Sequence, residues 1–406
     1  MECLGKRPGA ADVSRMKIVI VGGGVMGSSI AYHLASRPDL PNVQITVVER
    51  DPTYARASSS LSASSIREQF SAPINIAMSQ FGVSFLRDAP ALLATADHEP
   101  LLSVHLDGYL FLATDAGMEA LRARHETQRR MFADVTLLTP AQIAARFPWM
   151  STDGVAGGSL GLSREGWFDG PALLAAFRRK ARSLGVTYVA ANALGFRRGE
   201  GAKVDGVVLD DGATVACDVA VNAAGPWAGA MAATLGEVVP IRPRKRMVFV
   251  LACKTPLPDC PLVIDPTGFW MRPEGKLFLI GRSPTGDETD PDEPPLEVDE
   301  TMFTDVIWPA LAHRIPAMEA VRVTSSWAGY YEVNTFDHNG LVGALPGCPN
   351  VIIAAGFSGH GMQHSPAVGR GVAELVAAGE YETLDLSPLS PTRLLERRPL
   401  LELNVV

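Results

Sequence analysis

The sequence contains few cysteines, and their arrangement excludes several kinds of site. Among 406 residues there are five: Cys3, Cys217, Cys253, Cys260 and Cys348. Their number is odd, their spacing is irregular and no C-x-x-C occurs, so neither a disulfide framework nor a bound metal is expected. We expect small buried side chains in a reducing, cytoplasmic compartment.

Two other features are absent: an apolar run long enough to span a bilayer and an excess of positive charge. The net charge of −8 and the pI near 5.6 argue against nucleic acid or an anionic membrane as a partner. Residues 1–15 lack the apolar segment of a secretory signal and are predicted to be a disordered extension. The length and the 47% hydrophobic content allow two domains. They predict nothing about oligomeric state.

A glycine-rich segment lies between an expected strand and an expected helix. The segment at 17–21, β-branched from Ile18 onward, predicts a buried strand, GGGVMG follows at 22–27, and a helix is expected at 28–36. In such a G-x-G-x-x-G, Gly22 permits the tight turn and Gly24 lets the backbone approach a pyrophosphate. The N–H groups and the dipole at a helix N-terminus favour that anion.

An acid follows at the distance expected for a dinucleotide site. A second strand at 43–48 ends at Glu49, roughly 20 residues after Gly27, where an acid takes the ribose hydroxyls of adenosine. Gly27 lets the helix lie close to the sheet. The alternative is a βαβ turn without a nucleotide. The residues predicted to contact the nucleotide here are Gly22, Gly24, Val25, Met26, Gly27, Glu49 and Arg50.

The order of the expected elements predicts an α/β fold with a discontinuous Rossmann-like domain and an α+β domain that contains a large mixed or antiparallel sheet. Further helices are expected at 74–93, 118–131, 172–184 and 361–378, strands at 106–113, 186–190, 193–197, 204–209, 214–217, 219–225 and 351–355, and a β-rich block at 240–333. The nucleotide-binding domain is assigned to 16–99, 156–236 and 337–390, and the substrate domain to 100–155 and 237–336.

Four motifs resemble the D-amino-acid-oxidase-like superfamily of flavoproteins, which includes sarcosine oxidase, glycine oxidase and dimethylglycine dehydrogenase. They are Gly22–Gly27 with Glu49, the serine-rich run Ser58–Arg67, VNAAGPW at 221–227 and AGFSGHGM at 355–362. The segments at 65–71, 327–331, 334–337 and 385–388 are similar to the branch linked to assembly of respiratory complex I. The resemblance implies FAD rather than NAD.

A second glycine-rich turn supports FAD on physical grounds. Gly356–Gly361 precedes a helix, whose N–H groups and dipole can face the flavin N1–C2=O edge. That edge becomes negative on reduction, so the placement raises the reduction potential. The alternative is an ordinary strand-to-helix loop. By resemblance, the backbone of this segment contacts the flavin, and the alternative for His360 is proton transfer by its imidazole. The predicted contacts are Ala224, Gly225, Trp227, Gly329, Gly356, Phe357, Ser358, Gly359, His360, Gly361 and Met362.

The serine-rich run is expected to pass close to the isoalloxazine ring. Its predicted contacts are Ser58, Ser59, Ser60, Ser64 and Ser65, and the alternative is a solvated loop. By resemblance, Arg67 matches the arginine that binds the substrate carboxylate in sarcosine oxidase. A guanidinium grips a carboxylate with two hydrogen bonds. The alternative is a salt bridge with a surface acid.

Several positions depart from the family pattern. Gly329 stands where sarcosine oxidase has its flavin-linking cysteine, and the serine-rich run lacks the linking histidine of dimethylglycine dehydrogenase, so FAD is expected to be non-covalent. Gln363 replaces a second carboxylate-binding lysine, and Tyr331 replaces the carboxylate-binding arginine of glycine oxidase. Leu279 replaces the lysine that activates oxygen; the cations that could stand in for it are Lys276, Lys245 and Arg246.

The expected function is oxidation of an amine by FAD. Trp270, Tyr330 and Tyr331 are predicted to wall the substrate pocket, with plain core packing as the alternative; with Arg67, His360 and Gln363 they complete the predicted catalytic group. The substrate is a secondary or N-methyl amine or amino acid, whose hydride passes to flavin before water hydrolyses the imine. The acceptor is O2 or a quinone-like carrier, with O2 favoured. The alternatives are a flavin-binding assembly protein and a dehydrogenase.

Overall fold

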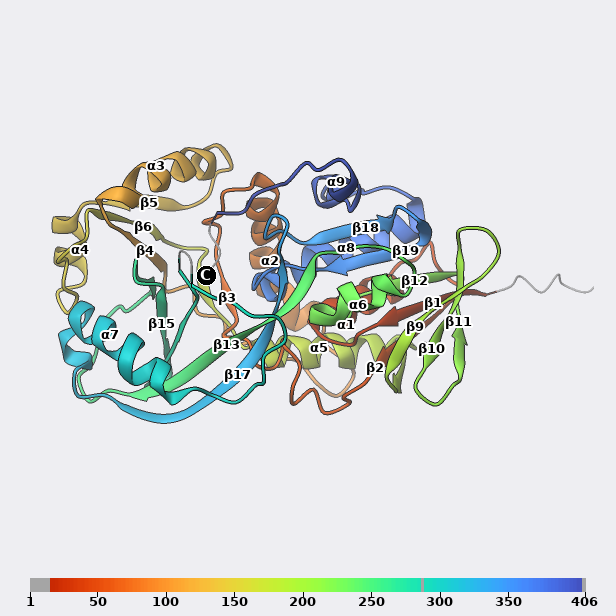
Figure 1. Cartoon of the computed structure of the whole chain (residues 1–406), viewed down its shortest axis with the longest axis horizontal. Helices are drawn as coiled ribbons and strands as arrows, with labels where there is room; N and C mark the ends of the chain where they lie inside the picture. The colour runs from red at the N-terminus through yellow and green to blue at the C-terminus, as the bar shows by residue number, and fades with distance from the viewer. Residues whose placement is uncertain (1–14, 286–287, 404–406) are drawn as a thin grey trace, which may run out of the picture.

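Two β-sheets, each with its own helices, form two lobes that lie side by side (Figure 1). The computed structural model describes residues 15–285 and 288–403. The extension predicted at residues 1–15 lies outside the described residues, except for Arg15. Among the residues described, no helix has both the length and the hydrophobicity needed to cross a bilayer.

A six-stranded sheet with the order β18-β19-β12-β1-β2-β8 forms the centre of one lobe. Its strands are β1 (Met16–Val21), β2 (Val43–Glu49), β8 (Thr187–Ala190), β12 (Val219–Asn222), β18 (Leu341–Leu345) and β19 (Cys348–Ala355). All neighbours are parallel except β18, which pairs antiparallel with β19. The carboxyl ends of the parallel strands therefore meet at one edge, which is where open α/β sheets bind ligands.

Both faces of this sheet are covered, which explains the continuous apolar run of β1. Ile18 and Ile20 enter the core under the helices, whereas Val19 and Val21 enter the core on the opposite face. The helices are α1 (Val25–Ala35), α2 (Pro73–Leu92), α5 (Gly170–Ser183) and α8 (Gly361–Ala378), and α1 packs on α5 and α8. The other face carries an antiparallel sheet of β9 (Ala193–Arg198), β10 (Val204–Leu209) and β11 (Thr214–Ala216), with α6 (Ala228–Ala233) beside it.

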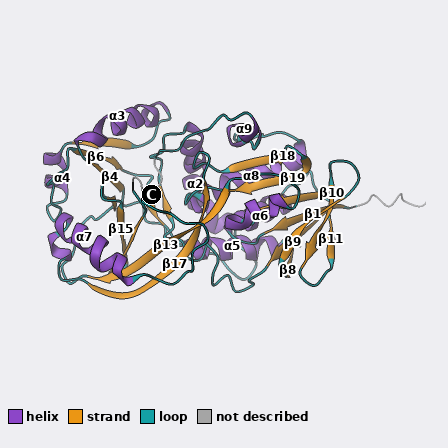
Figure 2. Ribbon diagram, in the orientation of Figure 1, coloured by secondary structure: helices purple, strands orange, loops and turns teal. Residues whose placement is uncertain are grey.

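An eight-stranded mixed sheet with the order β17-β13-β16-β15-β14-β4-β6-β5 forms the other lobe. Its strands are β4 (Tyr109–Ala113), β5 (Val135–Leu138), β6 (Gly157–Gly161), β13 (Ile241–Ala252), β14 (Leu262–Ile264), β15 (Phe269–Glu274), β16 (Leu277–Arg282) and β17 (Arg322–Asn334). The helices α3 (Asp115–Arg130), α4 (Pro140–Arg146) and α7 (Trp308–Arg314) lie around the outside of this lobe (Figure 2). The long strands β13 and β17 run from it to the junction between the lobes (Figure 1).

Short elements complete the chain. They are the pair β3 (Ser65–Ile66) and β7 (Gly166–Trp167), the 3-10 turns η1 (Gly225–Trp227), η3 (Pro316–Met318) and η4 (Ser387–Leu389), the π-helical η2 (Met302–Ile307), and α9 (Thr392–Leu395). The β3–β7 pair ties the segment before Arg67 to the start of α5. Near the end of the described chain, Glu402 accepts hydrogen bonds from the N–H groups of Ser71 and Ala72, so it holds the residues that lead into α2.

The predicted α/β architecture with a large mixed sheet is confirmed by the two sheets and their order. The block at 240–333 is β-rich as expected, since it contains β13 to β17, and it also contains α7, which packs its buried Leu311 against the sheet. One local expectation needs correction. Strand β6 falls in the segment 156–236, which we assigned to the nucleotide-binding domain, but it pairs with β4 and β5 in the eight-stranded sheet.

Candidate functional site

A cavity of about 400 Å³ lies along the carboxyl edge of the six-stranded sheet and reaches β17. It brings together segments that are far apart in sequence. The predicted cofactor contacts that line it are Gly22, Gly24, Val25, Met26, Glu49, Arg50, Ser58, Ser59, Ala224, Gly225, Trp227, Gly359, Gly361 and Met362. The other predicted contacts are absent from its lining: Gly27, Ser60, Ser64, Ser65, Gly329, Gly356, Phe357, Ser358 and His360.

The three motif glycines of the first turn have different surroundings. Gly22 has a φ of +96°, and a Cβ there would lie 2.3 Å from the carbonyl oxygen of Ala223. A Cβ on Gly27 would lie 1.9 Å from the carbonyl oxygen of Gly22, so α1 packs this closely only with glycine. A Cβ on Gly24 would meet Ser59 Oγ alone, at 3.2 Å. Gly22 and Gly27 therefore serve the fold, while Gly24 borders the ligand space.

The end of β2 presents an acid and a cation to the cavity. The Oε2 atom of Glu49 accepts a hydrogen bond from Gly23 N–H at 2.7 Å, and Oε1 accepts one from Asp51 N–H at 2.9 Å. The guanidinium carbon of Arg50 lies 3.5 Å from the centre of the Trp227 ring. One wall of the cavity is thus built from the end of β2 and the motif after β12.

The serine-rich run contacts both the cavity and the start of α5. Ser59 Oγ accepts a hydrogen bond from Val25 N–H at 3.0 Å, at the beginning of α1. Ser64 is buried and faces α5, since a Cβ on Gly170 would lie 2.1 Å from its Oγ. Ser65 begins β3. Ser58, Ser59 and Ser62 therefore border the ligand space, while Ser64 and Ser65 anchor the run.

The second glycine-rich turn is held against β17. Gly356 and Gly359 have φ values of +85° and +96°. Ser358 N–H donates to the carbonyl oxygen of Glu332 at 3.1 Å. A Cβ on Gly359 would lie 2.5 Å from Cε2 of Tyr331, so glycine is what permits this close approach. The turn that precedes α8 is therefore fixed by the strand that lines the cavity.

Glu332 is a cavity-lining acid that the sequence analysis did not single out. Its Oε1 accepts a hydrogen bond from Phe357 N–H at 3.3 Å. Burial raises the pKa of Glu332 to about 7, although the N–H groups of Gly356 and Phe357 act to lower it. Methyl groups placed on Gly361 and Gly225 would lie 3.1 Å from Oε1 and 3.6 Å from Oε2. The carboxyl group thus sits between the two glycine motifs.

Arg67 is buried among aromatic rings, with only 2% of its surface exposed. Its Nη1 donates to the hydroxyl of Tyr109 at 3.2 Å, and its Nη2 lies 3.0 Å from Nε2 of His360. Its guanidinium carbon is 4.6 Å from the ring centre of Phe70 and 5.2 Å from that of Phe111. A buried cation of this geometry is suited to a planar anion.

His360 and Gln363 both hold Arg67. A guanidinium only donates, so Nε2 of His360 accepts, which assigns the ring proton to Nδ1. Burial, and then the charge of Arg67, hold the pKa of His360 well below its ordinary value. The Oε1 atom of Gln363 accepts a hydrogen bond from the backbone N–H of Arg67 at 2.8 Å. Both side chains that we predicted to be catalytic therefore contact the arginine.

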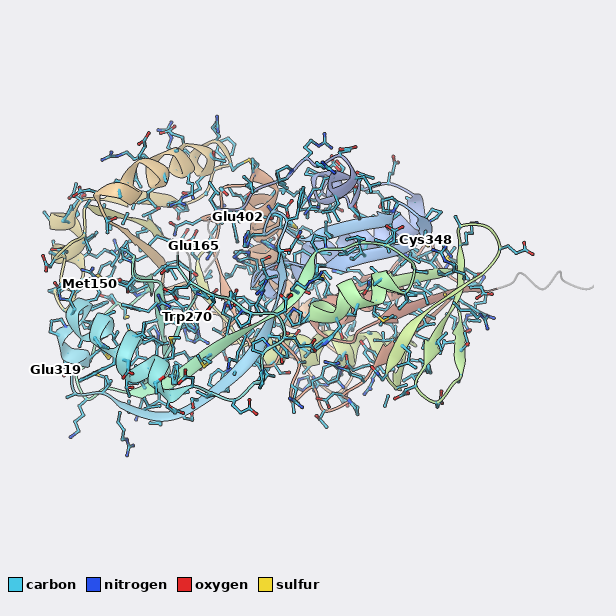
Figure 3. The ribbon with its side chains drawn as sticks, in the orientation of Figure 1. Met150, Glu165, Trp270, Glu319, Cys348 and Glu402 are labelled. Carbon is cyan, nitrogen blue, oxygen red and sulfur yellow. The ribbon has the colours of Figure 1, made fainter. Side chains whose placement is uncertain are left out.

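The three predicted aromatic walls occupy different places. Tyr330 and Tyr331 line the cavity, and the Tyr330 ring meets Trp227 edge-on with centres 5.9 Å apart. Trp270 lies among the strands of the eight-stranded sheet (Figure 3). Its ring covers Gly281, where a Cβ would be 2.6 Å from Cζ2. Trp270 is absent from the cavity lining, so its packing matches the core alternative.

Comparison with known proteins identifies the family. A sequence model described as DAO, FAD dependent oxidoreductase, matches residues 17–375. The chain belongs to this FAD-dependent oxidoreductase family. It is 43% identical to the FAD-dependent oxidoreductase domain-containing protein 1 of Xenopus laevis, over 97% of this chain and 85% of that protein. It is 27% identical to the glycine oxidase of Geobacillus kaustophilus, over 93% of this chain and 97% of that protein. The structure of L-proline dehydrogenase from P. horikoshii superposes with a TM-score of 0.82 at 25% identity, over 95% of this chain and 99% of that one.

FAD, the cofactor of the family, fits the residues that line the cavity. Gly24 leaves space at the N-terminus of α1, where a pyrophosphate is favoured. Glu49 would take the ribose hydroxyls, because each carboxylate oxygen uses only one of its lone pairs on the backbone. Gly359 and Gly361 would border the flavin at the N-terminus of α8.

The candidate cations for oxygen activation differ in their positions. Leu279 is buried in β16, within the core of the eight-stranded sheet. Lys276 is exposed in the turn between β15 and β16. Lys245 donates through Nζ to a backbone carbonyl at 3.1 Å. Arg246 lies 5.4 Å from the ring centre of Tyr331, which lines the cavity.

Sequence reasoning missed part of the lining. Besides Glu332, the unpredicted residues include Asp51, Arg56, Ala57, Ser62, Ala191, Asn192, Ala193, Leu194, Ala230 and Met231. The residues at 191–194 directly follow β8, a parallel neighbour of β2. The rule that ligands bind at the carboxyl ends of parallel strands could have found them. No pattern in the sequence indicated Met231 or Ala230, because α6 approaches from the opposite face.

Proposed function

We propose that this chain is an FAD-dependent amine oxidoreductase acting on a secondary or N-methyl amine or amino acid. The observation that carries the proposal is the buried guanidinium of Arg67, held by Tyr109 and His360. Near it, Tyr331 lines the cofactor cavity. A buried cation beside a cofactor cavity is suited to orient a substrate that carries a carboxylate.

Each side chain has a defined part in this proposal. Arg67 binds the carboxylate, and His360 and Tyr109 hold Arg67 in place. Tyr331 limits the space beside the second glycine turn and excludes water. FAD supplies the hydride acceptor at N5. The substrate enters as the neutral amine, so no strong base is required; His360 is neutral and its Nε2 is engaged with Arg67.

The reaction also consumes one molecule of water. Loss of a hydride from the carbon beside nitrogen leaves an imine, and water hydrolyses it to a carbonyl compound and a smaller amine. The glycine oxidase and L-proline dehydrogenase that resemble this chain are named for amino acids, which supports a CH–NH or CH–NH2 donor.

Molecular oxygen is the electron acceptor that we favour, with a quinone or another carrier as the alternative. Arg246 is the cation that supports oxygen, because it lies beside Tyr331. Its Nη1 and Nη2 atoms each lie 2.8 Å from a carboxylate oxygen of Asp290. This pairing reduces the positive charge that Arg246 could offer to a developing superoxide anion. It is therefore the observation in favour of the alternative acceptor, a quinone or another carrier.

The proposed compartment is the cytoplasm. Within the described part of the chain, Cys217, Cys253, Cys260 and Cys348 are all free thiols, which is usual where disulfides are reduced. A flavin-binding assembly protein stays the alternative to an enzyme.

Anaerobic reduction of the flavin tests the proposal. The purified yellow protein is mixed with a panel of amines and amino acids, including N-methyl amino acids and cyclic secondary amines, and flavin absorbance is followed. Rapid bleaching by an amino acid, with little effect of the matching alcohol or hydroxy acid, is expected. No bleaching across the whole panel, in protein that dithionite still reduces, would favour the assembly protein.

A further inference from the structure

Glu332 combines two properties that the proposed reaction does not use. Its carboxyl group lines the cofactor cavity, and it lies between Gly225 and Gly361, the glycines of two different cofactor motifs. Its hydrogen bonds come from the backbone N–H groups of Gly356 and Phe357 rather than from a cation. An acid in such a place changes its charge more readily than one in an ion pair.

The ionisable groups around Glu332 lie on its own strand, in the turn before α8, on β13 and along the cavity. On its own strand, Tyr330 and Tyr331 have pKa values raised by burial. From the turn before α8, His360 is neutral. On β13, Pro243 lies opposite Glu332, and the adjacent Arg242 and Arg244 both pair with Asp292. The remaining ionisable residues of the cavity are Glu49, Arg50, Asp51 and Arg56. Among the described residues, no charged side chain contributes to the pKa shift of Glu332.

Two negative charges would compete for the same stabilising groups when the flavin is reduced. The N-terminus of α8 favours an anion, and Glu332 Oε1 already takes an N–H group of the turn that precedes this helix. Reduction by hydride adds one negative charge to the flavin. In a cavity from which the cofactor excludes water, a second negative charge is costly, as for two carboxylates that share a site.

We propose that Glu332 binds a proton from solvent when the flavin is reduced and releases it when the flavin is reoxidised. The hydride carries two electrons and one proton to the flavin, and a second proton forms the O–H bond of Glu332, so the charge of the site is unchanged. The pKa of about 7 of this residue places the exchange in the physiological range. The inference rests on FAD in this cavity and does not depend on the amine substrate.

The test is the midpoint potential of the bound FAD as a function of pH, measured with reference dyes and electrochemical or dithionite reduction. For a two-electron couple the potential falls by about 30 mV per pH unit for each proton taken up. We expect about 30 mV per pH unit on the acid side of neutrality, where Glu332 is protonated in both redox states. On the alkaline side we expect about 60 mV. Protonation of the reduced flavin itself would steepen the acid side instead.

Glu332→Gln should keep the slope at about 30 mV per pH unit on the alkaline side. Glu237→Gln is the matched control, because Glu237 is similarly half-buried, accepts a backbone N–H from Gly347 at 2.8 Å and is absent from the cavity lining. It should behave as the wild type. A wild-type slope of about 30 mV on both sides, or a steep alkaline side in Glu332→Gln, would overturn the proposal.

A second measurement uses the wild type alone, so it tests the proposal even if Glu332→Gln loses its FAD. In reduced-minus-oxidised infrared spectra of the wild type above neutral pH, a protonated carboxyl band should appear on reduction; its absence would also overturn the proposal. Because neither measurement uses an amine, a protein that oxidises no amine can still confirm or refute the role of Glu332.

Discussion

Replacing Arg67 by leucine separates its proposed role in binding from its role in the fold. If Arg67 grips a carboxylate, the change removes a hydrogen bond to a charged group, which is worth about 1.5–3 kcal/mol. The dissociation constant of an amino-acid substrate should therefore rise about 10-fold to about 150-fold. FAD content should stay the same, because Arg67 is absent from the lining of the cofactor cavity.

The same change has a second cost that must be measured separately. Tyr109 and His360 lose their contacts with the guanidinium, and a buried polar group left without a partner costs about 1–3 kcal/mol. The free energy of unfolding, from urea titration, should fall by this order. Arg67→Lys retains the charge but loses the two-pronged geometry, so it should weaken binding less than leucine does.

The assay is an anaerobic titration of flavin absorbance with an amino acid and with the matching amine that lacks the carboxylate. Only the amino acid should bind more weakly to Arg67→Leu. Arg87→Leu is the control on the neighbouring helix α2, because the Arg87 side chain is 74% exposed and should affect neither ligand. An equal loss of affinity for both ligands in Arg67→Leu, or unchanged affinity for both, would remove Arg67 from carboxylate recognition.

Three further predictions concern the cofactor, the pH dependence and the acceptor. Acid or heat should release FAD into the supernatant, and flavin retained in the precipitate would contradict this; Gly24→Val should abolish flavin content, since the side chain would enter the pyrophosphate space. Burial raises the pKa of Glu165 from 4.5 to about 8, so the folded state favours the protonated acid, and the free energy of unfolding should fall by about 5 kcal/mol as pH rises between these values. Urea titrations should show a smaller fall in Glu165→Gln, and an identical fall would refute the assignment. Reduced enzyme should react quickly with oxygen and give stoichiometric peroxide, more slowly in Arg246→Gln; reoxidation far slower than turnover with an artificial acceptor would indicate a dehydrogenase.

The sequence predicted the cofactor cavity well where local patterns determine it. The first glycine turn, Glu49 and the turn at 356–361 each follow from a strand, a glycine pattern and a helix, and all three contribute residues to the cavity lining. Such motifs are short, and their geometry depends on backbone conformation alone. Parallel strands then bring their carboxyl ends to one edge, so the motifs meet.

The contacts of side chains between the lobes could not be predicted in this way. Glu332 reaches the cavity because β17 pairs with β13 across the junction, and predicting this requires the register of both strands. The resemblance predicts Trp270 in the wall of the substrate pocket, yet its ring covers Gly281 on the neighbouring strand. The environment of Arg67 likewise combines residues from β4 and the turn before α8.

The order of the strands has a consequence for biosynthesis. Strand β12 pairs with β1 on one side and with β19 on the other, while every strand of the eight-stranded sheet except β4, β5 and β6 is translated between β12 and β19. As the chain leaves the ribosome, the cofactor-binding sheet must therefore wait with an open, apolar edge until β19 emerges. An unpaired edge of this kind invites pairing with other chains. A nascent chain stalled before β19 is expected to depend on chaperones and to bind no FAD.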